Sequence, residues 1–247
     1  MSALQTQRLT EESSVGHWVA QHPVTADVYE TLRIDYSCSG DKSLKTVCRE
    51  NGLEVIRVHS LLQSTIADVD DATKNKWLHA PLADLCDHIE QSHHAFLKNS
   101  LPTATSLLAH VVELHSDDHP ELLEVHHHFV AWRDETLEVM AAEERSLFPA
   151  IRQMESEGES PSRDWRGIAK LIRRVGFEHN DIGVALSEAR DASGNYVAPP
   201  DASPTYRQTL GLLRRIEIDV RHHLHKEEHI LFPRVEKRAN KTGANEA

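Results

Sequence analysis

Two copies of one short motif, Glu-Glu-x-x-Leu-Phe-Pro, occupy residues 143–149 and 227–233 and place paired carboxylates 84 residues apart. Residues four apart on a helix share a face, so His223, four residues before Glu227, can approach the same centre as that carboxylate. In the first copy the corresponding position is occupied by Val139. Carboxylates and imidazoles directed from several helices toward one axis are what a carboxylate-bridged two-metal site in a helical bundle requires.

Two further histidines, each preceded by an acid, extend this pattern: Asp87-His88 and Glu178-His179 lie 91 residues apart. Taken alone, a histidine on an apolar helix face is more often a packing residue, and paired glutamates are often a solvated face. The near-equal offsets of the two patterns instead predict two related helix hairpins, each with one His-bearing and one Glu-bearing helix. The predicted ligands are His88, Glu143, His179, His223 and Glu227. Imidazole plus carboxylate suits iron, manganese or zinc, and bridging carboxylates favour a pair of iron or manganese ions.

The composition excludes several classes of protein. A formal charge of -12 argues against nucleic-acid binding, which needs a basic surface. No window approaches 18 consecutive apolar residues, and the polar N-terminus lacks the apolar core of a signal peptide, so we expect no membrane segment and a cytoplasmic location. Three cysteines are too few for a disulfide framework. We expect many of the 18 histidines not to bind metal. The consecutive ones at 126–128, for example, would point in three directions on a helix and cannot all bind one centre.

Helical periodicity dominates the chain, and strand signals are nearly absent. The sequence predicts an all-α protein in which a small helical domain at 13–72, carrying a loop around Cys38, precedes an antiparallel four-helix bundle at 81–238. Pro81 opens the first long helix of this bundle, and Leu101-Pro102-Thr103 is predicted to break it.

With these motifs the chain resembles the RIC proteins, the YtfE and ScdA type of di-iron proteins that repair damaged iron-sulfur clusters. The hemerythrin-like pattern of that family corresponds to Asp-His at 87–88, Glu-His at 178–179 and the segments 139–149 and 223–233. The segment Ile-Asp-Tyr-Ser-Cys-Ser-Gly at 34–40 resembles the Asp-Tyr-Cys-Cys-Gly-Gly signature of the family.

The resemblance covers roughly residues 13–237 and implies two irons bridged by Glu143 and Glu227. It implies that Glu135 and Glu178 lie near the site, as a second layer around the ligands or as a path for iron and protons. It also matches Cys38 with the second cysteine of the family's pair, as a thiol ligand or nucleophile.

Two residues depart from the family pattern. Val139 stands where the family has a histidine ligand, so one iron would be short of a ligand unless Glu135 or water fills the position. Ser37 replaces the first cysteine of the pair, so Cys38 cannot form a vicinal disulfide. The two other cysteines, Cys48 and Cys86, lie on apolar helical faces and are predicted to pack.

These features favour a protein that repairs, or supplies iron to, damaged iron-sulfur clusters under oxidative or nitrosative stress. Its partners would be iron-sulfur proteins as clients, with a homodimer possible and neither nucleic acid nor membrane involved. The alternatives are an oxidoreductase acting on nitric oxide or oxygen at the same centre, a hemerythrin-like sensor or carrier, and a bundle that no longer binds two metals. The sequence leaves open whether the protein is an enzyme.

Overall fold

The computed structural model describes residues 9–67, 76–156 and 165–243. These residues divide into two compact units with bounds Met1–His79 and Ala80–Ala247. Both units are helical, and within the described ranges the only β-type pairing is an isolated antiparallel bridge between Ser14 and Ser43. The all-α prediction is therefore confirmed.

The first unit consists of four short helices around one apolar core. They are α1 (Val15–Gln21), α2 (Thr25–Leu32), α3 (Leu44–Glu50) and α4 (Val55–Ala67). Ser14 and Ser43 cap α1 and α3, because each hydroxyl accepts a hydrogen bond from the backbone N–H three residues later. The largest fully buried side chains of this core are aromatic: Trp18, Tyr29 and Tyr36.

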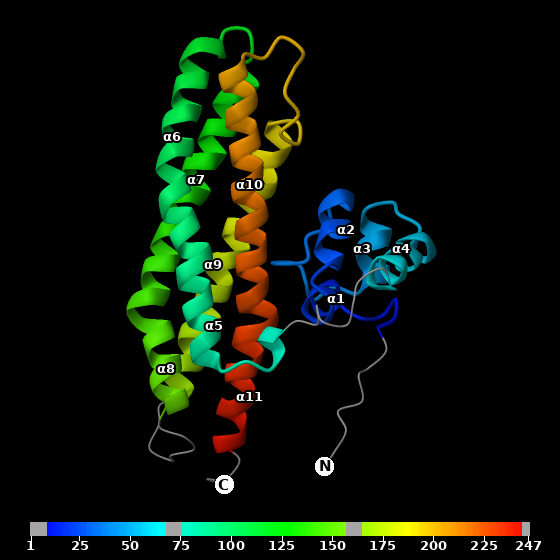
Figure 1. Cartoon of the computed structure of the whole chain (residues 1–247), viewed down its shortest axis with the longest axis vertical. Coiled ribbons are helices and arrows are strands. Elements are labelled where there is room, and N and C mark those ends of the chain that lie inside the picture. The colour runs from blue at the N-terminus through cyan, green and yellow to red at the C-terminus, as the bar shows by residue number, and fades with distance from the viewer. Residues whose placement is uncertain (1–8, 68–75, 157–164, 244–247) are drawn as a thin grey trace. The chain divides into compact units, whose positions relative to one another are not determined.

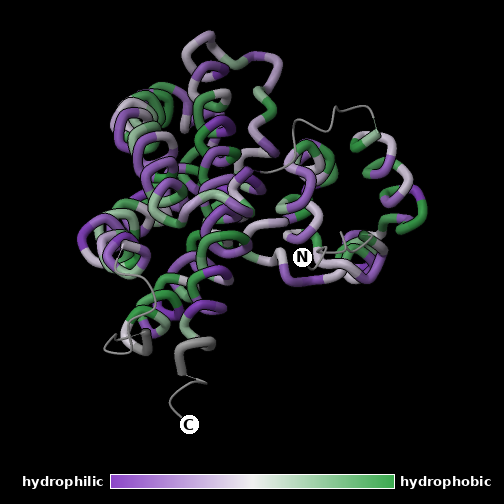
Figure 2. Tube along the Cα trace, turned by 60° about the horizontal axis from the view of Figure 1, so that its bottom comes forward, coloured by the Kyte–Doolittle hydropathy of each residue, from purple (hydrophilic) through white to green (hydrophobic). Residues whose placement is uncertain are grey.

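The second unit is a bundle of long helices (Figure 1). Its elements are α5 (Leu82–His88), α6 (Ala95–His115), α7 (Glu121–Ala142), α8 (Phe148–Ser156), α9 (Trp165–Ala192), α10 (Pro204–Lys226) and α11 (Phe232–Gly243). Helix α7 packs along α9, and α6 packs against both α7 and α10. Along these helices apolar and polar residues alternate (Figure 2), and the apolar ones include buried Leu97, Leu108, Phe129, Leu186 and Ile216.

The predicted break at Leu101-Pro102-Thr103 is wrong, because α6 continues through Pro102 to His115. Proline removes one backbone hydrogen bond from a helix interior. Here burial of Leu101, Ala104 and Leu108 on the inner face of α6 outweighs that loss. None of the described helices has the length and apolar character needed to cross a membrane.

Three π-helical segments interrupt the bundle helices: Ile89–His94, Glu143–Leu147 and Glu227–Leu231. The last two coincide with the repeated motif, so the repeated sequence produces a repeated local backbone. Pro149 and Pro233 follow these segments and lack the N–H that an α-helix would bond to the carbonyl four residues earlier. Single π-turns of this kind are frequent at functional sites.

Helix α5 begins with a capping interaction from a distant part of the chain. The Glu155 carboxylate on α8 accepts hydrogen bonds from the backbone N–H groups of Leu82 at 3.0 Å and Ala83 at 2.8 Å. The same carboxylate pairs with Arg238 of α11 at 3.1 Å. A carboxylate at a helix N-terminus satisfies unpaired donors and complements the helix dipole, so Glu155 fixes where α5 starts.

Candidate metal centre

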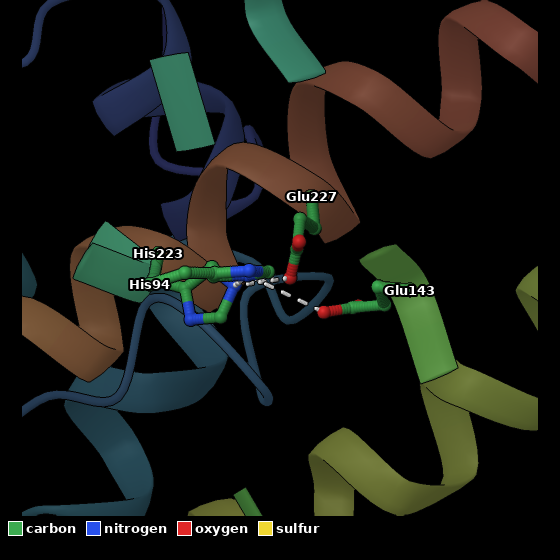
Figure 3. Close-up of side chains that lie close together, drawn as sticks. All are labelled: His94, Glu143, His223 and Glu227. Carbon is green, nitrogen blue, oxygen red and sulfur yellow. Dashed lines mark hydrogen bonds and ion pairs between the residues drawn. The ribbon is translucent and has the colours of Figure 1, made fainter. Parts of the chain in front are cut away.

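Four buried side chains from different parts of the bundle converge at the π-helical segments (Figure 3). His94, Glu143, His223 and Glu227 each offer one ligand atom, and these atoms all lie within 4.8 Å of one another. The Nε2 atoms of His94 and His223 are 3.1 Å apart. Nε2 of His223 is 3.0 Å from Oε2 of Glu227, and Nε2 of His94 is 3.5 Å from Oε2 of Glu143.

His179 of α9 adds a third imidazole. Its Nε2 lies 3.4 Å from Oε1 of Glu143 and 3.5 Å from Oε2 of Glu227. It therefore contacts both carboxylates, while His94 and His223 contact one each. Five potential ligands, three imidazoles and two carboxylates, surround one point in the bundle.

The second glutamate of each motif copy orients a histidine. Oε1 of Glu144 is 2.8 Å from Nδ1 of His94, and Oε1 of Glu228 is 2.7 Å from Nδ1 of His179. A carboxylate can only accept, so each Nδ1 carries the proton that it donates, and this is the arrangement that metal-binding histidines use. In contrast, Nδ1 of His223 is buried and finds no hydrogen-bond partner among the described residues.

The phenylalanine of each copy packs on the same histidine that the second glutamate holds. The rings of His94 and Phe148 stack with centroids 5.6 Å apart, and those of His179 and Phe232 stack at 5.9 Å. Each Glu-Glu-x-x-Leu-Phe segment thus supplies one inward carboxylate, one carboxylate for Nδ1 and one ring face.

Burial and mutual charge shift the pKa values of these groups apart. Burial and the negative charge of Glu143 raise the pKa of Glu227 well above its ordinary value. Burial would raise the pKa of Glu143 too, but His179 and His94 hold it below the ordinary value. Burial would lower the pKa of His179, yet its interactions with Glu143, Glu228 and Glu227 raise it to about 10. For His223, burial and the neighbouring His94 and His93 lower the pKa strongly.

The two central carboxylates fit a metal ion. Both oxygens of Glu143 and both of Glu227 are buried, and none makes a hydrogen bond within the part of the chain that the structure describes. A buried carboxylate without hydrogen bonds is costly, and coordination to a cation is the usual compensation. Three imidazoles and two carboxylates form the donor set expected for iron, manganese or zinc.

Comparison with known proteins agrees with this geometry. Residues 84–235 match the family model of the hemerythrin HHE cation binding domain. The chain belongs to this family. Residues 11–65 match ScdA_N, which is described as a domain of unknown function (DUF542).

Similar proteins carry both regions along nearly their whole length. The iron-sulfur cluster repair protein ScdA of Staphylococcus haemolyticus is 26% identical over 225 residues, which are 91% of this chain and 98% of the relative. The iron-sulfur cluster repair protein YtfE of Pectobacterium atrosepticum is 26% identical over 226 residues, covering 90% and 96%. These relatives confirm the resemblance drawn from the motifs.

Four of the five predicted ligands meet at the hemerythrin-like centre, and the fifth lies elsewhere. Nδ1 of His88, at the end of α5, is 3.0 Å from the hydroxyl of Ser92. The histidine that joins the other four is His94, at the end of the π-segment that follows His88. The sequence prediction missed this residue. The signal was available in the offsets: His94 and His179 are 85 residues apart, close to the 84 of the glutamate motif, whereas His88 and His179 are 91 apart.

Val139 and the predicted residue Glu135 lie on α7, and the predicted residue Glu178 lies on α9. Val139 is buried, with 3% of its surface exposed. Burial and the charges of Asp181 and Glu178 raise the pKa of Glu135. Glu178 forms an ion pair with Arg174 at 2.9 Å. Acidic groups of α7 and α9 are thus near neighbours.

Cys38 lies in the first unit, in a loop organised by Asp35. The Asp35 carboxylate accepts hydrogen bonds from the backbone N–H groups of Ser37, Cys38 and Ser39, and from the Ser37 hydroxyl. Cys38 is partly exposed, whereas Cys48 and Cys86 are buried. The hydroxyl of Ser37 is 3.8 Å from the Cys38 sulfur, so the serine occupies the place next to the thiol.

Proposed function

We propose that this protein binds iron at the bundle centre and uses it to repair, or supply iron to, damaged iron-sulfur clusters of client proteins under oxidative or nitrosative stress. The observation that carries the proposal is the pair of buried carboxylates, Glu143 and Glu227, whose oxygens face three imidazoles and find no hydrogen-bond partner among the described residues. The names of the similar proteins supply the reaction: they are iron-sulfur cluster repair proteins.

In this proposal the Glu143 and Glu227 carboxylates and the imidazoles of His94, His179 and His223 would hold the iron. Glu144 and Glu228 keep Nε2 of their histidines free for a metal by holding the proton on Nδ1. Iron bound here supplies a reducible and exchangeable ion. Because several helices supply these side chains and other contacts hold the helices in place, an ion could leave without unfolding of the bundle.

We assign Glu135 and Glu178 to the path of iron and protons. Their carboxylates lie near each other beside Asp181, and Glu178 directly precedes the ligand His179. Adjacent carboxylates attract cations, which raises the local concentration of ferrous ions at that side of the bundle. Cys38, partly exposed in its loop, is the candidate thiol for contact with iron or with a client cluster.

The test is recovery of a client enzyme. An iron-sulfur dehydratase inactivated with hydrogen peroxide is incubated anaerobically with the iron-loaded protein, and its activity is followed. Wild-type protein should restore activity, Glu227→Ala should not, and the exposed-site variant Glu124→Ala should match wild type. Equal recovery with Glu227→Ala would contradict the proposal, because that variant lacks a bridging carboxylate.

Consumption of nitric oxide by the same samples separates the alternative. Rapid turnover under reducing conditions, without recovery of the dehydratase, would favour an oxidoreductase. Recovery of the dehydratase without such turnover supports repair.

A further inference from the structure

We propose, resting on the function above, that the two metal positions are unequal. The position between His94 and His223 is complete and retains its ion, whereas the position between His179 and Val139 is incomplete and exchanges its ion. The structure therefore identifies which half of the centre lost a ligand.

The argument starts from the internal repeat of the bundle. A shift of 84 or 85 residues relates the first half of the centre to the second, and the contacts repeat along with the residues. The hydrogen bond between His94 and Glu144 in the first half corresponds to the one between His179 and Glu228 in the second. The stacking of His94 on Phe148 likewise becomes the stacking of His179 on Phe232.

The same relation assigns partners across the centre. His94 lies against His223, with Nε2 atoms 3.1 Å apart. The repeat carries His94 onto His179, and it carries Val139 onto His223. The mate of the His94–His223 pair is therefore His179–Val139. Valine has no donor atom, so this second position keeps one imidazole and the two shared carboxylates, while the first has two imidazoles and the same carboxylates.

Behind His223, on the side of the complete position, the His93 side chain is held by hydrogen bonds at both ring nitrogens. Nδ1 of His93 is 2.9 Å from Oδ1 of Asp219, and Nε2 of His93 is 3.0 Å from the mostly buried ammonium of Lys226. The His93 ring stacks on His223 with centroids 5.9 Å apart. These contacts fix the His93 ring, which in turn holds His223 in place.

The corresponding layer of the incomplete position has a different character. Under the same shift, Glu135 corresponds to Asp219, Glu178 corresponds to His93, and Ala142 corresponds to Lys226. The ammonium and the imidazole are thus replaced by a methyl group and a carboxylate. Asp181 adds another acid near Glu135. Fewer potential ligands, together with the loss of the His93–Lys226 contact, favour entry and exit of a ferrous ion on this side.

The unequal halves suit iron supply. A retained ion would keep the Glu143 and Glu227 carboxylates neutralised while the other ion exchanges. The centre then avoids exposing two uncompensated buried carboxylates in each cycle.

The experiment measures iron release. Protein loaded anaerobically with ferrous iron and freed of excess is mixed with a colorimetric ferrous chelator, and total iron is determined in parallel. Wild type should release one equivalent in a fast phase and the second at least roughly tenfold more slowly, since loss of one ligand weakens binding at least as much as loss of a supporting residue. His179→Gln should abolish the fast phase alone, and His94→Gln should abolish the slow one. Val139→His should convert the fast phase to a slow one.

The exposed-site variant His110→Ala serves as the control and should match wild type, while circular dichroism checks that every variant is folded. Two equivalents released in a single phase by wild type would overturn the inequality. So would retention of the slow equivalent by His94→Gln. Either result leaves the repair function standing, whereas biphasic release without recovery of the dehydratase would overturn the function and leave the inequality.

Discussion

The two motif-bearing segments, 139–149 and 223–233, have nearly the same local structure and differ in one ligand. Each forms a π-turn, directs its first glutamate into the centre and gives its second glutamate to a histidine of another helix. They differ at the residue four before the first glutamate, which is Val139 in one and His223 in the other. The motif therefore binds and orients a histidine of another helix. These contacts form whether or not the motif's own helix carries a histidine four residues before the first glutamate.

The helix pairs that carry these segments differ in a second respect. In the first, Glu155 accepts two backbone hydrogen bonds from the start of α5. The residue 84 positions later is Ala239, which offers no carboxylate. The halves of the bundle thus share the contacts of the centre, whereas the position of the capping carboxylate Glu155 is alanine in the second half.

The largest expected effect comes from removing an inward carboxylate of either copy. Glu143→Ala and Glu227→Ala should each lose most of the bound iron with little change in helicity, because each carboxylate serves both metal positions. Metal analysis after anaerobic loading, with circular dichroism alongside, measures this. If one variant keeps stoichiometric iron while the other loses it, the two glutamates are not equivalent bridges.

An intermediate effect is expected at the second glutamates. Glu144→Ala and Glu228→Ala should each weaken iron binding by roughly 10- to 100-fold, the usual cost of losing a residue that orients a ligand histidine. Chelator competition measures the affinities. The variants Glu144→Gln and Glu228→Gln should regain part of the loss, because an amide oxygen still accepts the hydrogen bond from Nδ1.

This pair also tests the inequality of the halves. Glu144→Ala should affect the slowly released ion, and Glu228→Ala the rapidly released one. Weakening of the same ion by both variants would show that the repeat does not separate the two positions.

The smallest expected effect concerns Glu155, the carboxylate that caps the start of α5. Glu155→Gln should lower the free energy of unfolding of the iron-free protein by about 1 kcal/mol, the typical value of a capping interaction. Burial would raise the pKa of Glu155, but the N–H groups of Ala83 and Leu82, with Arg238, hold it below its ordinary value of 4.5. A carboxyl whose folded pKa is depressed contributes stability above its unfolded pKa and loses it as the pH falls through the folded value.

Denaturant unfolding at neutral pH and below pH 4.5 checks this prediction. The difference between wild type and Glu155→Gln should shrink at the lower pH, and the exposed-site variant Glu113→Gln should show no difference at either. A gap between wild type and Glu155→Gln that does not change with pH would show that charge on Glu155 has no part in the cap.

Much of the fold could be predicted from the sequence because the signals were local. Apolar periodicity predicted the helices, and Pro81 marked a helix start that the structure shows. The prediction failed at Pro102, where burial of the flanking leucines outweighs a lost backbone hydrogen bond. The local sequence indicates that proline removes a backbone hydrogen bond from the helix, but it does not indicate the tertiary packing that offsets this loss.

For the centre, the sequence by itself determined the ligand types, the repeat and the missing histidine at Val139. It did not determine that His94 takes the place assigned to His88, because the π-turn over Ile89–His94 changes which residues share a face, and a periodicity of 3.6 cannot reveal that. Nor did it determine that the second glutamates hold His94 and His179, since those contacts join helices far apart in the chain. Only the tertiary structure decided which histidine lies across from which, and hence which histidine has Val139 as the counterpart of its partner.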